Sequence, residues 1–404
     1  MLKLIEAKVK ELEPLLINIR RYLHQNPELS GKEYNTTNFI NNKLTEAGIH
    51  SEIITTDAGP AVIAYIGNDK SKKTIALRAD IDALPLTEKE KLPYCSKVDG
   101  VMHACGHDFN MTSVLGAGFI LASFIDKLEV NIKLIFQPSE ETAQGGARAV
   151  VKTGVLQDTD AIFTVHALPG IDAGKIGIKS GIITAAIDMF KISTKGSGGH
   201  SARPHLATDA IFITNQVLNI LYSDITRHFD PIIPVVLSIG SIKGGSAPNI
   251  ISDSCEIEGT VRTFDENLRT NLKDLIYKRV EETTKMYGAT SEIYWHSGPS
   301  SVNNDISLSK LTEKSANEIL GAENVVIMQE PSMGAEDFSQ YLDNIPGMLI
   351  RIGTGGENCC HPLHSCQFKI NENAIGVAVK VLTATVLNYN LSAKQNEELL
   401  NKDV

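Results

Sequence analysis

The stretch TIALRADIDALP, residues 74–85, joins a strand-like run to acidic side chains. The run is short and mostly apolar, as buried strands are, and Asp80 and Asp82 stand at its end. In open α/β sheets, functional sites form beyond the carboxyl ends of the strands. The stretch therefore predicts a strand that delivers two carboxylates to such an edge.

The segments on either side alternate between strand and helix patterns. Apolar runs with strand character occupy residues 61–67, 130–141 and 161–169, and residues 111–125 have the composition of a buried helix. A helical pattern with a candidate break at Pro14 opens the chain. Strands that alternate with helices indicate an α/β fold, with many parallel strand pairings and helices on both faces of the sheet.

A different order of elements occupies residues 183–296. Four strand patterns and two helix patterns follow one another there as β-α-β-β-α-β. That order is typical of the ferredoxin-like split arrangement. We therefore predict a discontinuous main domain, residues 1–182 and 297–404, into which a small α+β domain, residues 183–296, is inserted.

The composition is that of a folded, mildly acidic protein. Apolar residues make up 42% of the chain, and 38 Lys and Arg against 48 Asp and Glu give a formal net charge of −10. Nucleic-acid binders normally present a basic face, so nucleic acid is not expected as a partner. Charges interrupt every apolar run near the start, which argues against a signal peptide, and no stretch is expected to span a membrane. We expect a cytoplasmic protein.

The six cysteines are not expected to form a disulfide framework. In a cytoplasmic protein they should be reduced thiols. The chain contains no C-x-x-C pair, which disfavours a structural zinc finger or a thioredoxin-type redox site.

Reactive side chains cluster where the strand patterns end. Glu140 and Glu141 end one strand pattern, and His166 ends the apolar part of the next. HACGHD, residues 103–108, precedes a helix pattern, and HPLHS, residues 361–365, follows a late strand pattern. Thiolate, imidazole and carboxylate groups are the ligands of zinc and of neighbouring first-row metals. One of two adjacent glutamates can bind a metal while the other takes the proton of the attacking water.

Each of these motifs has an ordinary structural explanation when it is taken singly. Paired glutamates usually form a solvated surface, and a single cysteine is more often inert core. Neighbouring side chains of an extended chain also point opposite ways, so a turn after Pro138 must bring both glutamates to one site. The coincidence of four such segments at strand ends favours a metal site.

Two other functions fit parts of the same pattern. Cys105 can be read as a nucleophile that attacks an amide, with His103 or His107 as its base and no metal. The competing acidic cluster argues against this amidase, and chelation separates the two hypotheses. The third hypothesis is a non-catalytic metal-binding or ligand-binding protein, which a turnover assay would exclude.

Together the motifs resemble a known family, the dinuclear metallo-amidohydrolases and metallopeptidases that include aminoacylases, carboxypeptidase G, hippurate hydrolases and auxin-amino-acid conjugate hydrolases. The matching stretches follow the family's order along nearly the whole chain: RADIDALP (78–85), HACGHD (103–108), QPSEE (137–141), VHALPGIDAGKIGIKSG (165–181), GSGGHSARPH (196–205), GGSAPNII (244–251), GTVRTF (259–264), MGAEDFSQY (333–341) and PLHS (362–365). The resemblance implies a mostly parallel-sheet, metallopeptidase-like catalytic domain with an inserted ferredoxin-like lid and dimerisation domain.

The resemblance also implies a role for individual residues. The ligands of two divalent metal ions would be Cys105, His107, Glu141, His166 and His364. Glu140 would be the general base and acid, and Asp82 would orient a metal ligand from behind. His200 would reach the site from the other subunit of a homodimer and steady the developing oxyanion. Asn249 and Arg262 would contact the substrate, with Arg262 pairing with its carboxylate.

The implied reaction is hydrolysis of the amide bond in an N-acyl amino acid or a similar small peptide-like amide. The acyl group (acetyl, benzoyl or another), the amino acid and the metal (Zn, Mn, Ni or Co) all stay open. Three positions depart from the family pattern. Asn110 stands where relatives often have a histidine, and Cys366 where they commonly have a proline. Asp80 stands where peptidase-type relatives have a histidine ligand, a role that Cys105 would take over.

Overall fold

The computed structural model describes residues 1–142 and 145–400, without the side chains of residues 226 and 392–400. The chain divides into two compact units. Unit 1 comprises Met1–Ile183, Asn303–Glu330 and Asp337–Val404, and unit 2 comprises Thr184–Val302 and Pro331–Glu336. The expected insertion, residues 183–296, falls within unit 2 except at its first residue, and unit 2 also takes residues 297–302 and 331–336.

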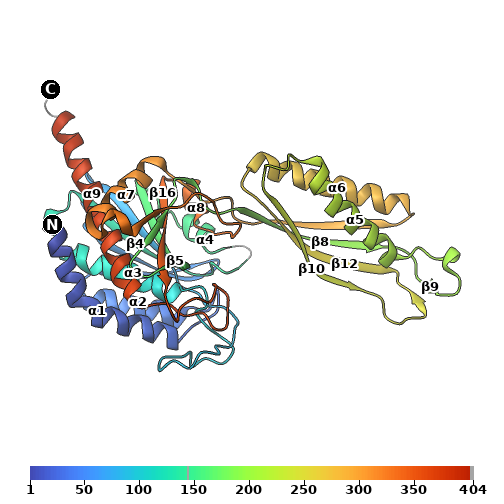
Figure 1. The fold of residues 1–404 in the computed structure, drawn as a ribbon, viewed down its shortest axis with the longest axis horizontal. Coiled ribbons are helices and arrows are strands. Elements are labelled where there is room, and N and C mark those ends of the chain that lie inside the picture. Colours follow the sequence, from blue (N-terminus) through green and yellow to red (C-terminus); the bar gives the residue numbers. More distant parts are fainter. Residues whose placement is uncertain (143–144, 401–404) are drawn as a thin grey trace. The chain divides into compact units, whose positions relative to one another are not determined.

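Unit 1 is built on an eight-stranded sheet (Figure 1). Across the sheet the strands are β1 (His50–Thr56), β2 (Gly59–Ile66), β4 (Val130–Gln137), β3 (Lys73–Asp80), β5 (Ala161–Asp172), β16 (Gly347–Gly355), β6 (Ile176–Ile178) and β15 (Val325–Ile327). The central strands from β4 to β16 pair in parallel, as do β6 and β15. The pairs β1–β2, β2–β4 and β16–β6 are antiparallel. The predicted α/β fold with a mostly parallel central sheet is confirmed.

Helices and turns of unit 1 complete the fold. They are α1 (Leu2–Gln25), α2 (Tyr34–Glu46), α3 (His107–Ala122), α4 (Ala147–Lys152), α7 (Ile306–Leu320), α8 (Ser339–Leu342), α9 (Asn373–Leu400) and the 3-10 turns Ile125–Lys127 and Ala322–Asn324. Two short strands, β7 (Gly181–Ile182) and β14 (Asn303–Asn304), pair with each other. Every residue of β4 is buried, which is why its apolar run is continuous and not alternating. The central strands therefore have both faces covered.

Helix α9 meets the length and composition of a membrane span over Asn373–Leu391, with a mean hydropathy of 1.3. It is the single helix of the described residues that does so. Of that window, 72% is buried inside the protein. The helix contacts α1, α3 and α7, so its apolar composition is that of a core helix.

Unit 2 is a four-stranded antiparallel sheet with two helices on one face (Figure 1). Across the sheet the strands are β10 (Val235–Gly244), β12 (Ser254–Thr263), β8 (Ala186–Lys195) and β13 (Thr290–Ser297), and the helices are α5 (Ala210–His228) and α6 (Glu266–Met286). A short pair, β9 (Gly199–His200) with β11 (Ile250–Ile251), and the 3-10 turn Pro204–Leu206 complete the unit. Its own core consists of Phe190, Ile192, Val217, Leu221, Ile257, Val261, Ile276 and Val280. The predicted ferredoxin-like order is present.

Three element bounds differ from the expectations. Helix α1 runs unbroken through Pro14. Strand β3 ends at Asp80, and its last hydrogen bond to β4 runs from the amide of Ile81 to the carbonyl of Gln137 at 3.0 Å. Strand β5 continues to Asp172, so His166 lies within the strand and faces Arg351 of β16 in register.

Candidate metal centre

The loop before α3 brings two of the expected ligands to the carboxyl edge of the sheet. Gly106 has φ +83°, a left-handed conformation that glycine adopts without strain, and it directly precedes the helix. Its position between Cys105 and His107 lets the chain turn sharply, and both neighbouring side chains are buried. The same loop anchors the last motif, because the amide of His364 donates to the carbonyl of Ala104 at 2.8 Å.

The expected ligand atoms converge in unit 1. The Cys105 Sγ lies 3.6 Å from the His166 Nε2. The Glu141 Oε1 lies 3.8 Å from the His107 Nε2 and 3.3 Å from the His364 Nε2. Cys105, His107 and His166 form one group whose ligand atoms all lie within 4.8 Å of one another, and Cys105, Glu141 and His364 form another.

This donor set fits divalent metal ions. The His107 Nε2 and the Glu141 Oε1 are buried atoms with no hydrogen-bond partner among the described residues. Buried polar atoms normally have a partner, so two that face each other at 3.8 Å need an explanation, and a cation between them is one. Sulfur, imidazole nitrogen and carboxylate oxygen suit zinc and the neighbouring first-row metals.

Backbone contacts set the orientation of two imidazoles. The Nδ1 of His107 donates to the carbonyl of Asp82 at 2.9 Å, and the Nδ1 of His166 donates to the carbonyl of Ala167 at 2.9 Å. Each ring therefore carries a proton on Nδ1 and turns its Nε2 toward the cluster. The Asp82 Oδ1 also lies 3.3 Å from the His107 Nδ1, so Asp82 is on the side of the ring that faces away from the cluster.

Asp80 has hydrogen-bond partners of its own, and it also lies in a further group of possible ligands with His166 and Glu336. Its carboxylate accepts hydrogen bonds from Arg78 Nη1 and Asn110 Nδ2, each at 2.8 Å. Burial raises the pKa of Asp80, but the charges of His107 and Arg78 more than offset this and lower the pKa to about 2. Asn110 thus stands beside the cluster as a donor to Asp80.

The surroundings of Cys105 do not favour the thiolate that a nucleophile needs. Burial, and then the charge of Glu141, raise its pKa well above the ordinary value. A nucleophilic cysteine needs the thiolate, which a raised pKa disfavours. His103 is a poor base as well, because burial lowers its pKa to about 4.

The turn that brings Glu140 and Glu141 to the cluster follows Pro138, as the sequence requires. Ser139 has φ +58°, a left-handed conformation that a residue with a side chain rarely adopts. The Glu140 Oε2 then lies 3.9 Å from the His107 Nε2. The amide of Ser139 donates to the buried Glu33 Oε1 at 2.9 Å. Sequence reasoning missed Glu33, because a lone glutamate in a loop has no motif.

The expected substrate residues lie in unit 2. His200 and Asn249 line the same pocket of about 660 Å³. The Nδ1 of His200 accepts the amide of Ala202 at 3.0 Å, which leaves its Nε2 to carry the proton and donate. Arg262 does not line that pocket, and its Nη1 donates to the carbonyl of Met333 at 2.8 Å.

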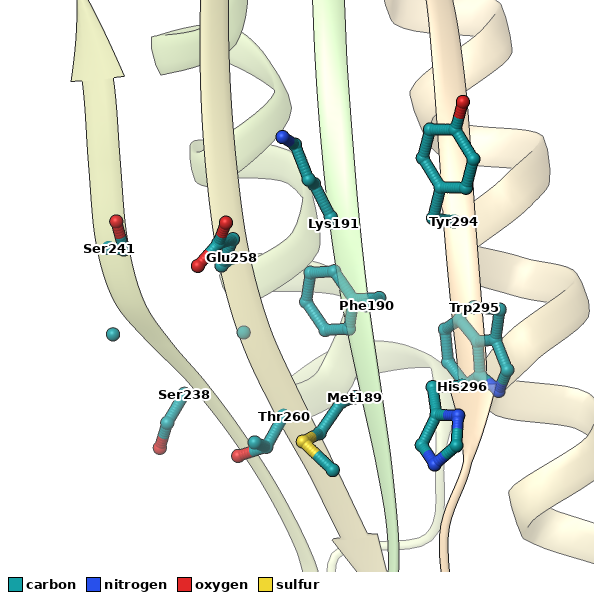
Figure 2. Close-up of a pocket in the computed structure, with 12 residues that line it drawn as sticks. Met189, Phe190, Lys191, Ser238, Ser241, Glu258, Thr260, Tyr294, Trp295 and His296 are labelled. Carbon is teal, nitrogen blue, oxygen red and sulfur yellow. The ribbon is translucent and has the colours of Figure 1, made fainter. Parts of the chain in front are cut away.

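A second hollow of unit 2, of about 590 Å³, contains none of the expected residues. All four strands of the sheet contribute to it (Figure 2). Its lining consists of Met189, Phe190, Lys191, Ser238, Gly240, Ser241, Glu258, Gly259, Thr260, Tyr294, Trp295 and His296. Strand β10 shifts register between Ile239 and Ser241, and Gly259 has no room for a Cβ beside Phe190 and the Ser238 carbonyl.

Comparison with known proteins identifies the family of the chain. The chain is 42% identical over 369 residues to the N-acetyl-L-cysteine deacetylase of Bacillus subtilis, covering 91% of this chain and 86% of the relative. It is 33% identical to an IAA-amino acid hydrolase of Arabidopsis thaliana, over 98% and 90% of the two chains. The crystal structure of the Bacillus subtilis YXEP protein, a dinuclear metal binding peptidase, matches with a TM-score of 0.80 and 36% identity, over 94% of this chain and 98% of that one. Residues 76–388 match the family model, and the chain belongs to peptidase family M20/M25/M40.

Proposed function

We propose that this protein hydrolyses the amide bond of N-acyl amino acids, or of similar small peptide-like amides, with Glu140 as the general base. The residues that would hold two divalent metal ions are Cys105, His107, Glu141, His166 and His364. Bound ions would supply acidification of a water and polarisation of the substrate carbonyl. The observation that best supports the proposal is the approach of Glu141 to both His107 and His364, with Glu140 next to it in the chain.

The protein's own groups would carry the proton through the reaction. Glu140 would take it from the attacking water and return it to the departing amine. Asp82 would keep a proton on the Nδ1 of His107 and so orient its Nε2 toward a bound metal. His200 would donate from Nε2 to the developing oxyanion, a contribution often worth about 3 kcal/mol. Asn249 and Arg262 would bind the substrate, with Arg262 pairing with its carboxylate.

The relatives support the substrate class. The names of the two relatives describe removal of an acetyl group from an N-acetyl amino acid and hydrolysis of an acyl-amino acid conjugate. Both are amides of an amino acid nitrogen. We therefore propose N-acetyl, N-benzoyl or similar N-acyl amino acids as substrates, Zn, Mn, Ni or Co as the metal, a homodimer as the active form and the cytoplasm as its location.

Replacing Glu140 with Gln tests the reaction. We expect Glu140→Gln to lower kcat on a panel of N-acyl amino acids by at least 100-fold, because general acid–base catalysis contributes about 10²–10⁴-fold. Bound metal, measured by elemental analysis, should stay at the wild-type level. Glu6→Gln, an exposed change on α1, is the matched control and should leave kcat unchanged.

Chelation separates this mechanism from the cysteine amidase. Wild-type protein dialysed against a chelator should lose activity and regain it with one of the four divalent metals. Activity that survives complete removal of metal, or wild-type kcat in Glu140→Gln, would contradict the proposal. Absence of turnover by the metal-loaded wild type on the whole panel would favour a non-catalytic binding protein.

A further inference from the structure

The turn between β4 and α4 holds two side chains that the extended chain would point apart. Ser139 makes this turn in a left-handed conformation, with φ +58°. Such a conformation is strained in a residue with a side chain, so the surrounding structure must stabilise it. Because Glu140 follows directly, any relaxation of Ser139 would move the Glu140 carboxylate away from the cluster.

Ser139 is bound from two sides. Its amide donates to the Glu33 Oε1 at 2.9 Å, and its hydroxyl donates to the carbonyl of Ala58 at 2.7 Å. Glu33 lies in the loop between α1 and α2 and is fully buried. Gly59 allows the close approach, because a Cβ there would lie 3.1 Å from the Glu33 Oε2 and 3.0 Å from the Cα of Gly31.

The same loop also contacts the other side of the turn. The hydroxyl of Ser30 donates to the Asp82 Oδ2 at 2.7 Å, and that oxygen also accepts the amide of Glu141 at 2.9 Å. Ser30 and Glu33 thus bind the turn at both ends, one through Asp82 and one directly. Glu33 is 106 residues away from Ser139 in the chain, and no residue of its loop belongs to the groups of possible ligands among the described residues.

We propose that Glu33 is a positioning residue, which holds Ser139 in its left-handed conformation and so keeps Glu140 in place for proton transfer. The inference rests on the proposed function, because it assigns Glu33 a role in the reaction of Glu140.

The buried position of Glu33 lowers the stability of the fold, which is unexpected for a residue with a purely structural role. Its Oε2 has no hydrogen-bond partner among the described residues. Burial, and then the charge of Asp82, raise the pKa of Glu33 to about 7. A buried carboxyl group with one unpaired oxygen lowers stability, which fits a residue needed for activity.

Two substitutions at Glu33 separate its hydrogen bond from its bulk. Glu33→Gln keeps an acceptor for the Ser139 amide, whereas Glu33→Met has a similar length and no such acceptor. We expect Glu33→Met to lower kcat on the best N-acyl amino acid by about 10- to 100-fold, the size of effect that small misplacements produce. KM and bound metal should stay within twofold of wild type. Glu33→Gln should retain kcat within about threefold, and in the Glu140→Gln background Glu33→Met should cause no further loss.

Hydrogen–deuterium exchange supplies a readout that needs no activity. In Glu33→Met, exchange at the Ser139 amide should increase, whereas exchange in the core of α3 should not. Wild-type kcat or unchanged exchange at Ser139 in Glu33→Met would overturn the inference. An equal loss of kcat in Glu33→Met and Glu33→Gln would overturn it as well. A metal-loaded wild type without turnover would instead overturn the proposed function, and the exchange measurement would still decide whether Glu33 holds the turn.

Discussion

The partners of each carboxylate decide what that residue can do. Asp80 and Asp82 stand two positions apart in one motif. Arg78 and Asn110 donate hydrogen bonds to the Asp80 carboxylate, whereas the Asp82 carboxylate lies beside the Nδ1 of His107. The charge pattern of the motif could not separate these roles, because both aspartates follow the same apolar run.

A buried ionic network secures the residue next to His107. The Asp108 Oδ2 lies 2.8 Å from both the Arg20 Nε and the His24 Nδ1, and the His24 Nε2 lies 3.2 Å from Glu88. These contacts tie α1 to the first turn of α3. Burial and the charge of Arg20 lower the pKa of His24, but Asp108 and Glu88 raise it by more, so the net pKa lies above the ordinary value.

The raised pKa of His24 predicts a pH-dependent stability. Protonated His24 contributes stability that is complete below about pH 6.5 and is lost as the pH rises through the raised pKa of the folded protein. The difference in free energy of unfolding between the metal-free wild type and His24→Gln should therefore be largest near pH 6 and shrink by pH 9, as denaturant titrations would measure. His50→Gln, at an exposed histidine of β1, should show no such trend. A His24→Gln difference that is constant with pH would contradict this explanation.

At the scale of elements, α1 continues through Pro14 because its buried face packs on the core. Pro14 cannot donate to the carbonyl of Lys10, and its ring crowds that carbonyl. Both residues are exposed, so water can satisfy the freed carbonyl, while the buried Leu16, Ile19 and Leu23 hold the helix on the core. Helix α1 therefore continues where the sequence indicated a break.

Replacing Pro14 should measure the cost of this proline. We expect Pro14→Ala to raise the free energy of unfolding by about 1–3 kcal/mol, since proline in a helix interior costs about 3 kcal/mol and the unfolded chain regains some entropy. Denaturant titration is the measurement, and Lys10→Ala on the same exposed face is the control. A Pro14→Ala variant that is less stable than wild type would show that the proline is accommodated without cost.

At the scale of the whole molecule, the proposed residues belong to two units. All five candidate ligands and Glu140 lie in unit 1, whereas His200, Asn249 and Arg262 lie in unit 2. Each unit has its own hydrophobic core. A reaction that needs both sets depends on how the units, or two copies of the chain, come together.

Mixed dimers test whether His200 acts across subunits. If the protein forms the proposed homodimer, the Glu140→Gln and His200→Ala variants should each be nearly inactive. If His200 serves the partner's site, a mixed dimer has one site with both groups intact and should recover up to half of the wild-type kcat per dimer after subunit exchange. If His200 serves its own subunit, no site is complete and the mixture stays inactive. Co-expression with two affinity tags would isolate the mixed dimer for the assay.

The sequence by itself determined the strand and helix order, the ferredoxin-like pattern of unit 2 and the set of reactive residues. The order of elements follows from local periodicity, whereas the candidate residues follow from side-chain chemistry at several strand ends and from the family resemblance. Only the tertiary structure decided that Glu33 binds Ser139 and that α1 passes unbroken through Pro14. It also decided that Arg78 and Asn110 donate hydrogen bonds to Asp80. The physical reason is that such partners are chosen by burial and by distances between segments far apart in the chain, and these leave no periodic trace in the sequence.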